Sequence, residues 1–202
     1  MRVTDKDRKI YRYIEDNNFA TVKQIGNVFY NDIIYKNELA KKRLNCLIEH
    51  NYIKKTKSVN CSQHIYYIDD KYKRQTYHNI IIMDFYTKFL EMKGVEVLEF
   101  IKEKEWNNKK VRSDALISIS VNDEIIYFIL EVQTSKNDYK SNLDKYLDKN
   151  TVNDIVHYCK GSFPVIVLVD EIFHNISKYN NYLQIVQLDQ KLTNFPLVFQ
   201  TE

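Results

Sequence analysis

The stretch that most constrains the fold is RSDALISISVNDEIIYFILEVQTS, residues 112–135. Two apolar runs flank the pair Asn122-Asp123, a combination that predicts a β-hairpin. If the loop holds only these two residues, the numbers of cross-strand partners add to 245, so that Asp114 stands opposite Glu131. Gln133 then shares a face with Glu131, because side chains in a strand alternate with a period of two. A three-residue loop would instead make the two acids diagonal neighbours.

Either register gathers two carboxylates at one end of an apolar hairpin. Directly opposed like charges are about 5 Å apart and destabilise the pair. A Mg²⁺ ion would relieve the repulsion, since it binds carboxylate oxygens, keeps several waters, and can assist the displacement of a phosphate. Alternatively, both acids lie in solvent at the strand ends or pair with a nearby lysine. Two acids at this spacing do not decide between these interpretations.

The segments around the hairpin predict an α/β domain with a central mixed sheet. Residues 71–80 read as a linker entering a helix that is apolar on most faces and ends at Gly94. The run FPVIVLVD, residues 163–170, has the pattern of a strand buried on both faces. The other expected elements are a strand at 95–106, helices at 135–150 and 151–161, and a strand at 182–188.

The N-terminal third predicts three helices followed by a hairpin. Thr4, Thr21 and Asn37 are N-cap candidates, and each precedes apolar residues at helical spacing. Two short strand-like runs follow, at 52–57 and 64–68. This order of elements is typical of a winged helix-turn-helix. We therefore expect one domain over residues 1–72 and the α/β domain over residues 73–202.

The charge of the chain is unevenly distributed. Residues 1–75 hold 16 Lys and Arg against 9 Asp and Glu, whereas residues 76–202 hold 14 against 18. A basic N-terminal third favours a polyanionic partner for that part of the chain. No long apolar run or signal-peptide pattern is present, so we expect no membrane span. The three cysteines show no CxxC spacing, which indicates a reducing, cytoplasmic compartment.

Double-stranded DNA is the expected partner of the basic third. Exposed polar side chains of the third helix would read base edges in the major groove, and lysines of the hairpin would contact phosphate. The alternative is a solvated helix face on a protein-docking module. The candidate DNA-binding residues are Asn37, Lys41, Lys42, Arg43 and Asn45 on the helix, and Lys54, Lys55 and Lys57 on the hairpin.

The motifs of the second domain also resemble a known nuclease core. SDA before an apolar strand, a turn, and a strand ending in EVQ resemble the PD-(D/E)xK core, as do the LDKYL helix and the FPVIVLVD strand. Together with an N-terminal winged helix, the chain resembles the replication-relaxation family of plasmid and phage proteins. The motifs that carry this second resemblance are His78 with DFYTKFL, Asp114-Ala115, EVQT at 131–134, Lys145-Tyr146 and the run at 164–169.

The resemblance implies a DNA-binding protein of a mobile element, acting in replication, DNA relaxation, maintenance or transfer. It also allows a homodimer and contacts with replication or transfer machinery. The nuclease-like domain is then favoured as a non-catalytic scaffold. Two alternatives stay open: a metal-dependent DNA endonuclease that nicks its site, and a transcriptional regulator with an effector or dimerisation domain.

Carried over residue by residue, the resemblance places a metal at Asp114 and Glu131. Gln133 stands where the core usually has Lys, and a neutral amide supplies no cation. Lys145 on the following helix would then be a displaced substitute. The candidate catalytic set is thus Asp114, Glu131, Gln133 and Lys145, and Mg²⁺ is expected only if that set is active. Candidates for a third acid are Asp84, Glu91 and Glu99.

Overall fold

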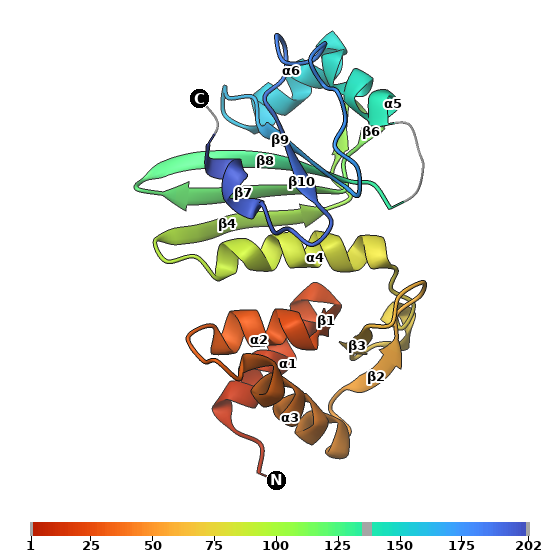
Figure 1. Cartoon of the computed structure of the whole chain (residues 1–202), viewed down its shortest axis with the longest axis vertical. Helices are drawn as coiled ribbons and strands as arrows, with labels where there is room; N and C mark the ends of the chain where they lie inside the picture. The colour runs from red at the N-terminus through yellow and green to blue at the C-terminus, as the bar shows by residue number, and fades with distance from the viewer. Residues whose placement is uncertain (1, 135–138, 201–202) are drawn as a thin grey trace. The chain divides into compact units, whose positions relative to one another are not determined.

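The computed structural model describes residues 2–134 and 139–200, and it divides the chain into two compact units, Met1–Glu91 and Met92–Glu202 (Figure 1). Within the described residues, six α-helices accompany a five-stranded mixed sheet and two smaller sheets. Helix α4 (Tyr77–Leu90), which we expected at the start of the second domain, groups with the first unit. In the described part of the chain, no helix has the length and apolar character needed to cross a bilayer.

The first unit contains the expected three helices and hairpin. Its sheet has the order β1-β3-β2, with both strand pairs antiparallel. Strand β1 was not expected, because three residues are too few to show an alternating pattern. The elements of this unit before α4 are α1 (Asp5–Asn17), β1 (Phe19–Thr21), α2 (Val22–Tyr30), α3 (Lys36–Glu49), β2 (Lys54–Lys57), β3 (His64–Tyr67) and the 3₁₀ turn η1 (Asp70–Tyr72).

Two of the three predicted helix caps are confirmed. Thr4 and Thr21 each form a capping box at the start of α1 and α2. The prediction for Asn37 is wrong, since α3 begins one residue earlier and Asn37 lies in its first turn. There Asn37 packs against α2, so closely that a Cβ added at Gly26 would lie 2.7 Å from its Oδ1. Gly26 therefore leaves room for the Asn37 side chain against α2.

The second unit is built on the sheet β10-β9-β8-β7-β4. Strands β4, β7 and β8 are antiparallel neighbours, whereas β8, β9 and β10 are parallel, so the expected mixed sheet is confirmed. The ribbon β5-β6 was not expected. The elements are β4 (Val95–Lys102), β5 (Glu105–Trp106), β6 (Val111–Arg112), β7 (Ala115–Val121), β8 (Glu124–Val132), α5 (Tyr139–Asp144), η2 (Lys145–Leu147), α6 (Lys149–Tyr158), β9 (Val165–Asp170), β10 (Ile185–Asp189) and η3 (Phe195–Phe199).

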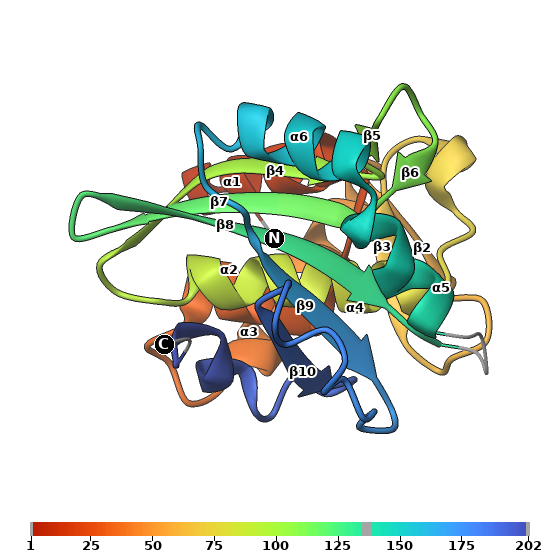
Figure 2. The same cartoon turned by 90° about the horizontal axis from the view of Figure 1, so that it is seen from above.

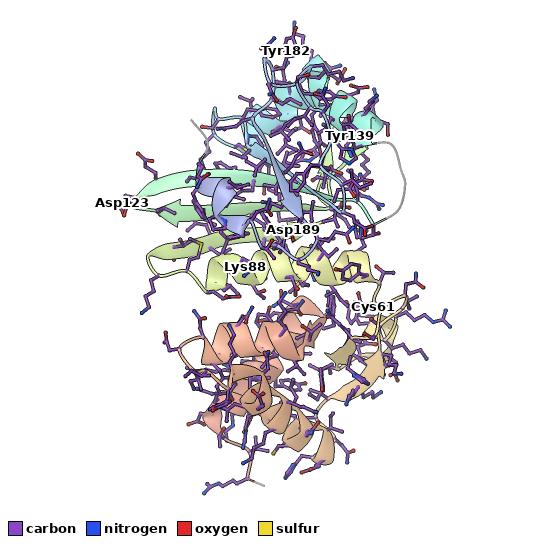
Figure 3. All side chains as sticks on the ribbon, in the orientation of Figure 1. Cys61, Lys88, Asp123, Tyr139, Tyr182 and Asp189 are labelled. Carbon is purple, nitrogen blue, oxygen red and sulfur yellow. The ribbon has the colours of Figure 1, made fainter. Side chains whose placement is uncertain are left out.

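The β7–β8 hairpin has a two-residue loop, the first of the two loop lengths that the sequence left open. Asn122 and Asp123 have φ values of 50° and 67°, the left-handed conformation that a type I′ turn requires. Asp123 lies at the hairpin tip in Figure 3. Ala115 pairs with Leu130, so the register that brings Asp114 opposite Glu131 is confirmed.

Helices α5 and α6 cover one face of the sheet (Figures 1 and 2). The core beneath them includes Ile129 of β8, Ile166 of β9 and Tyr146 of η2, all fully buried. Part of the helix expected at 135–150 lies outside the described residues. The described part is broken into α5 and η2, and the second expected helix is α6. This packing brings residues of η2 against the end of β8.

Candidate nucleic-acid interface and carboxylate site

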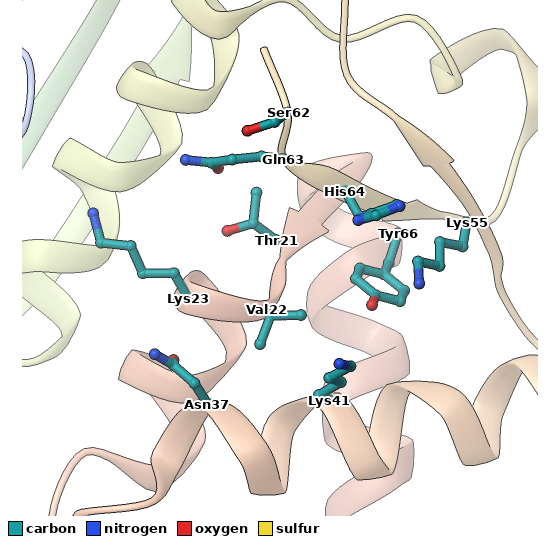
Figure 4. A pocket seen from close by; sticks show the side chains of 10 residues that line it. All are labelled: Thr21, Val22, Lys23, Asn37, Lys41, Lys55, Ser62, Gln63, His64 and Tyr66. Carbon is teal, nitrogen blue, oxygen red and sulfur yellow. The ribbon is translucent and has the colours of Figure 1, made fainter.

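A groove of about 380 Å³ lies between α3 and the β2–β3 hairpin (Figure 4). One wall is the N-terminal half of α3, the other is the hairpin, and the start of α2 closes one side. The residues that line it are Thr21, Val22, Lys23, Asn37, Lys41, Lys55, Ser62, Gln63, His64 and Tyr66. Three of the predicted DNA-binding residues, Asn37, Lys41 and Lys55, are thus gathered around one groove.

Strand alternation decides which hairpin lysines face the groove. Lys55 pairs with Tyr66 and Lys57 pairs with His64 across the ladder. Because these four residues are two apart along each strand and paired across it, they share the face that lines the groove. Lys54 belongs to the opposite face, where its Nζ lies 2.7 Å from Asp70 Oδ2.

The pKa of His64 reports the electrostatic field in the groove. Partial desolvation at the groove wall lowers the pKa of this imidazole, and the positive charges of Lys55, Lys57 and Lys41 lower it further. These three lysines come from β2 and α3. The two walls of the groove therefore act on one ring, and the field there is positive.

Helix α3 presents a polar stripe beside the groove. Asn37, Lys41 and Asn45 are exposed and four residues apart, so they lie on one face of the helix. Lys42 is exposed on the adjacent face. The buried side of the helix, with Ala40, Leu44 and Leu47 among its apolar residues, packs into the unit.

Arg43 is engaged within the first unit. Its Nε donates to Asp7 Oδ1 at 2.6 Å, and its Nη2 pairs with Asp7 Oδ2. Asp7 is fully buried and is also the N3 residue of the Thr4 capping box, so Arg43 neutralises an otherwise costly charge. The structure thus gives Arg43 and Lys54 intramolecular partners, and we leave both out of the proposed interface.

Lys23 is likewise held at the rim of the groove. Its Nζ lies 2.7 Å from Asp84 Oδ2 of α4, and Gln24 Nε2 donates to Asp84 Oδ1 at 2.7 Å. Asp84 therefore ties α4 to α2 within the first unit, whereas the predicted carboxylate site is in the second unit.

In the second unit, Asp114 lies directly before β7. Its Oδ2 accepts a hydrogen bond of 2.7 Å from the backbone N–H of Val132, and its own N–H donates to Leu130. The Asp114 carboxylate thus continues the β7–β8 ladder beyond the last strand pair. This contact places it beside Glu131, as the hairpin register predicted.

Glu131 lies in a polar network under η2. The side chain is only 3% exposed, its Oε1 accepts a hydrogen bond from the Tyr146 hydroxyl, and Lys145 Nζ lies 3.2 Å from the same oxygen. Lys145 also donates to the carbonyl of Arg112 at 3.0 Å. Lys145 therefore reaches the predicted acid pair, and Tyr146 is a partner that the sequence did not reveal.

Burial raises the pKa of Glu131 to about 7. Lys145 and Tyr146 oppose this shift, while the neighbouring Asp114 charge adds to it. The pKa of Tyr146 is raised as well, by its burial and by Glu131. The site thus holds a carboxyl group that exchanges a proton near neutral pH beside a fixed lysine.

Two further candidates for the catalytic site, Gln133 and Glu99, have other contacts. Gln133 is 4% exposed, and its backbone bonds to Val169 and to the Gln190 side chain. Glu99 of β4 accepts a hydrogen bond from the Tyr158 hydroxyl of α6, so its carboxylate links the strand to that helix. Among the described residues, no group of three or more His, Cys, Asp or Glu side chains is arranged to hold a metal.

The donor types at Asp114 and Glu131 suit Mg²⁺, which accepts one or two protein carboxylates and retains waters. If such an ion were bound, these two residues would hold it, with Lys145 beside Glu131. It would supply Lewis-acid chemistry toward a phosphate.

No protein-family model matches this chain, and no curated protein matches it at a significant level.

Proposed function

We propose that the chain is a double-stranded DNA-binding protein whose N-terminal unit is a winged helix-turn-helix. The observation that carries this proposal is the convergence of Lys41, Lys55 and Lys57 from two elements on the groove around His64. A groove with positive charge on both walls suits a polyanion that lies along it.

In this proposal the two walls have different tasks. Lys55 and Lys57 of the hairpin contact phosphates, which gives affinity without sequence choice. Asn37, Lys41 and Asn45 on α3 face the major groove, where amide and ammonium groups can bond to base edges. Lys42 contacts the backbone beside them.

We propose further that the second unit is a PD-(D/E)xK nuclease-like domain that serves as a scaffold, in a protein that acts in replication, relaxation, maintenance or transfer of a plasmid or phage. Support comes from the position of Asp114 and Glu131 at the end of an antiparallel hairpin that continues into a parallel strand. A non-catalytic role is favoured because Glu131 is bound internally by Tyr146 and Lys145, and because Gln133 is buried.

Anisotropy of a labelled random-sequence duplex, titrated with the protein at low salt, tests the DNA-binding proposal. We expect the variant Lys55→Ala/Lys57→Ala to bind about tenfold more weakly or worse, because two phosphate-facing charges are removed. The matched control is Lys9→Ala/Lys73→Ala, which removes two exposed lysines of the same unit outside the groove. Equal losses in both variants would refute the groove as the binding site.

A second candidate function is a metal-dependent DNA endonuclease, and the meeting of Asp114, Glu131 and Lys145 favours it. The test is incubation of supercoiled plasmid with the protein in Mg²⁺ or Mn²⁺, beside Asp114→Ala and Glu131→Ala. The scaffold proposal predicts intact plasmid with all three proteins. Nicking by the wild type alone would refute the scaffold proposal and support the endonuclease.

A further inference from the structure

We propose that His64 is a phosphate contact that binds DNA in its protonated form, so that DNA binding in the groove takes up a proton. The inference rests on the proposed function and adds a residue that the sequence pattern did not select.

His64 is positioned in the groove beside the lysines. The side chain lies on the groove face of β3, opposite Lys57 and in the same groove as Lys41 and Lys55 (Figure 4). It is exposed at the groove wall. A phosphate that lies between α3 and the hairpin would therefore approach the imidazole together with the lysines.

In the free protein, the charge state of the His64 ring depends on its charged neighbours. The groups that face it are Lys55 and Lys57 of β2, Lys41 of α3 and Tyr66 of β3, while the loop contributes the uncharged Ser62 and Gln63. Partial desolvation and the three ammonium charges keep the pKa of His64 below its usual value. At neutral pH the free groove thus holds a neutral histidine.

A bound phosphate changes the charge state of His64. A nearby negative charge favours the imidazolium and offsets the lysine field, so the pKa of His64 rises on binding. Because the complex then holds more protons than the free protein, affinity must rise as pH falls through the pKa of the complex. The gain levels off below the pKa of the free protein.

The experiment measures duplex affinity at constant low salt, from about pH 8 to about pH 6. We expect wild-type affinity to rise by about threefold to tenfold over this range, and the rise to be largely absent in His64→Gln. His50→Gln is the matched control, because His50 is at the C-terminal end of α3, where Nδ1 contacts the Cys46 carbonyl at 2.8 Å. It should retain the wild-type pH dependence.

A second variant separates charge from structure. His64→Arg carries a permanent positive charge, so it should bind at about pH 8 as tightly as the wild type does at about pH 6, with little pH dependence. Calorimetry in two buffers of different ionisation enthalpy should show proton uptake with the wild type and less with His64→Gln. Equal pH slopes in wild type and His64→Gln, with both binding, would overturn this inference alone. A wild type that binds no duplex at low salt would overturn the proposed function itself.

Discussion

At the scale of single residues, the most consequential group is the Glu131 carboxyl. It is buried, and one of its oxygens accepts a hydrogen bond from Tyr146 and pairs with Lys145. The negative charge of Asp114 is also close enough to raise its pKa. Burial of a charge in this setting costs free energy that the two donors offset only in part, which is why its pKa is raised. The ionised form of Glu131 is thus disfavoured in the folded protein.

The raised pKa of Glu131 predicts a pH dependence of stability. Its pKa is 4.5 when unperturbed and about 7 in the folded protein, so between these values the folded state binds more protons than the unfolded state. The free energy of unfolding should therefore fall as pH rises from about 5 to about 7, by about 3 kcal/mol at most. Urea unfolding across this range measures it.

Glu131→Gln is the variant that isolates this effect. The amide oxygen still accepts from Tyr146, but the side chain no longer titrates, so the fall in stability over this pH range should shrink. Glu99→Gln is the control, because Glu99 also accepts from a tyrosine but has a less buried environment. An undiminished fall in Glu131→Gln would show that another group is responsible.

At the scale of elements, two periodicities determine which side chains line the groove: the alternation of side chains along β2 and β3, and the helical spacing of residues along α3. Two lysines of the KKTK strand face the groove and the third pairs with Asp70. Position along the strand, and not charge alone, thus decides which lysines can meet phosphate. The shape of the groove depends in turn on how closely α3 packs against α2.

The α2–α3 contact predicts a specific steric effect. Gly26→Ala would place a methyl group 2.7 Å from Asn37 Oδ1 and 3.4 Å from the Lys36 backbone. The nearest atom is the end of an exposed, flexible side chain that can rotate away, and alanine is the better helix former, so we expect the free energy of unfolding to change by about 1 kcal/mol at most. Chemical denaturation of the variant measures this change.

The double variant Gly26→Ala/Asn37→Ala tests whether the Asn37 side chain opposes the methyl group. Removing the Asn37 amide takes away the nearest atom, so Gly26→Ala should be more stabilising on the Asn37→Ala background than in the wild type, by about 1 kcal/mol. An equal effect of Gly26→Ala on both backgrounds would show that the Asn37 side chain does not oppose the methyl group.

At the scale of the whole molecule, local signals in the sequence were the most informative. The Asn122-Asp123 turn fixed the β7–β8 register, because both residues tolerate positive φ and the loop length then determines every pair. The meeting of Asp114 with Glu131 followed from that register. The threonine caps and the apolar periodicity likewise predicted α1 and α2 closely.

Features that depend on packing between distant segments could not be predicted. Helix α4 is apolar on most faces, so its sequence does not show that Asp84 ties it to α2. The bond from Tyr146 to Glu131 depends on how η2 crosses the sheet, and the pairing of Arg43 with Asp7 depends on how α3 meets α1. The field at His64 also arises only when α3 and the hairpin face each other.

The measurement that tests the central claim most directly is the salt dependence of duplex affinity for wild type and Lys55→Ala/Lys57→Ala. Each phosphate contact contributes close to one unit to the slope of log K against log salt, so the account predicts a steep wild-type slope that falls by about 2 in the variant. An unchanged slope would contradict the account, because it would place the phosphate contacts outside the groove between α3 and the β2–β3 hairpin.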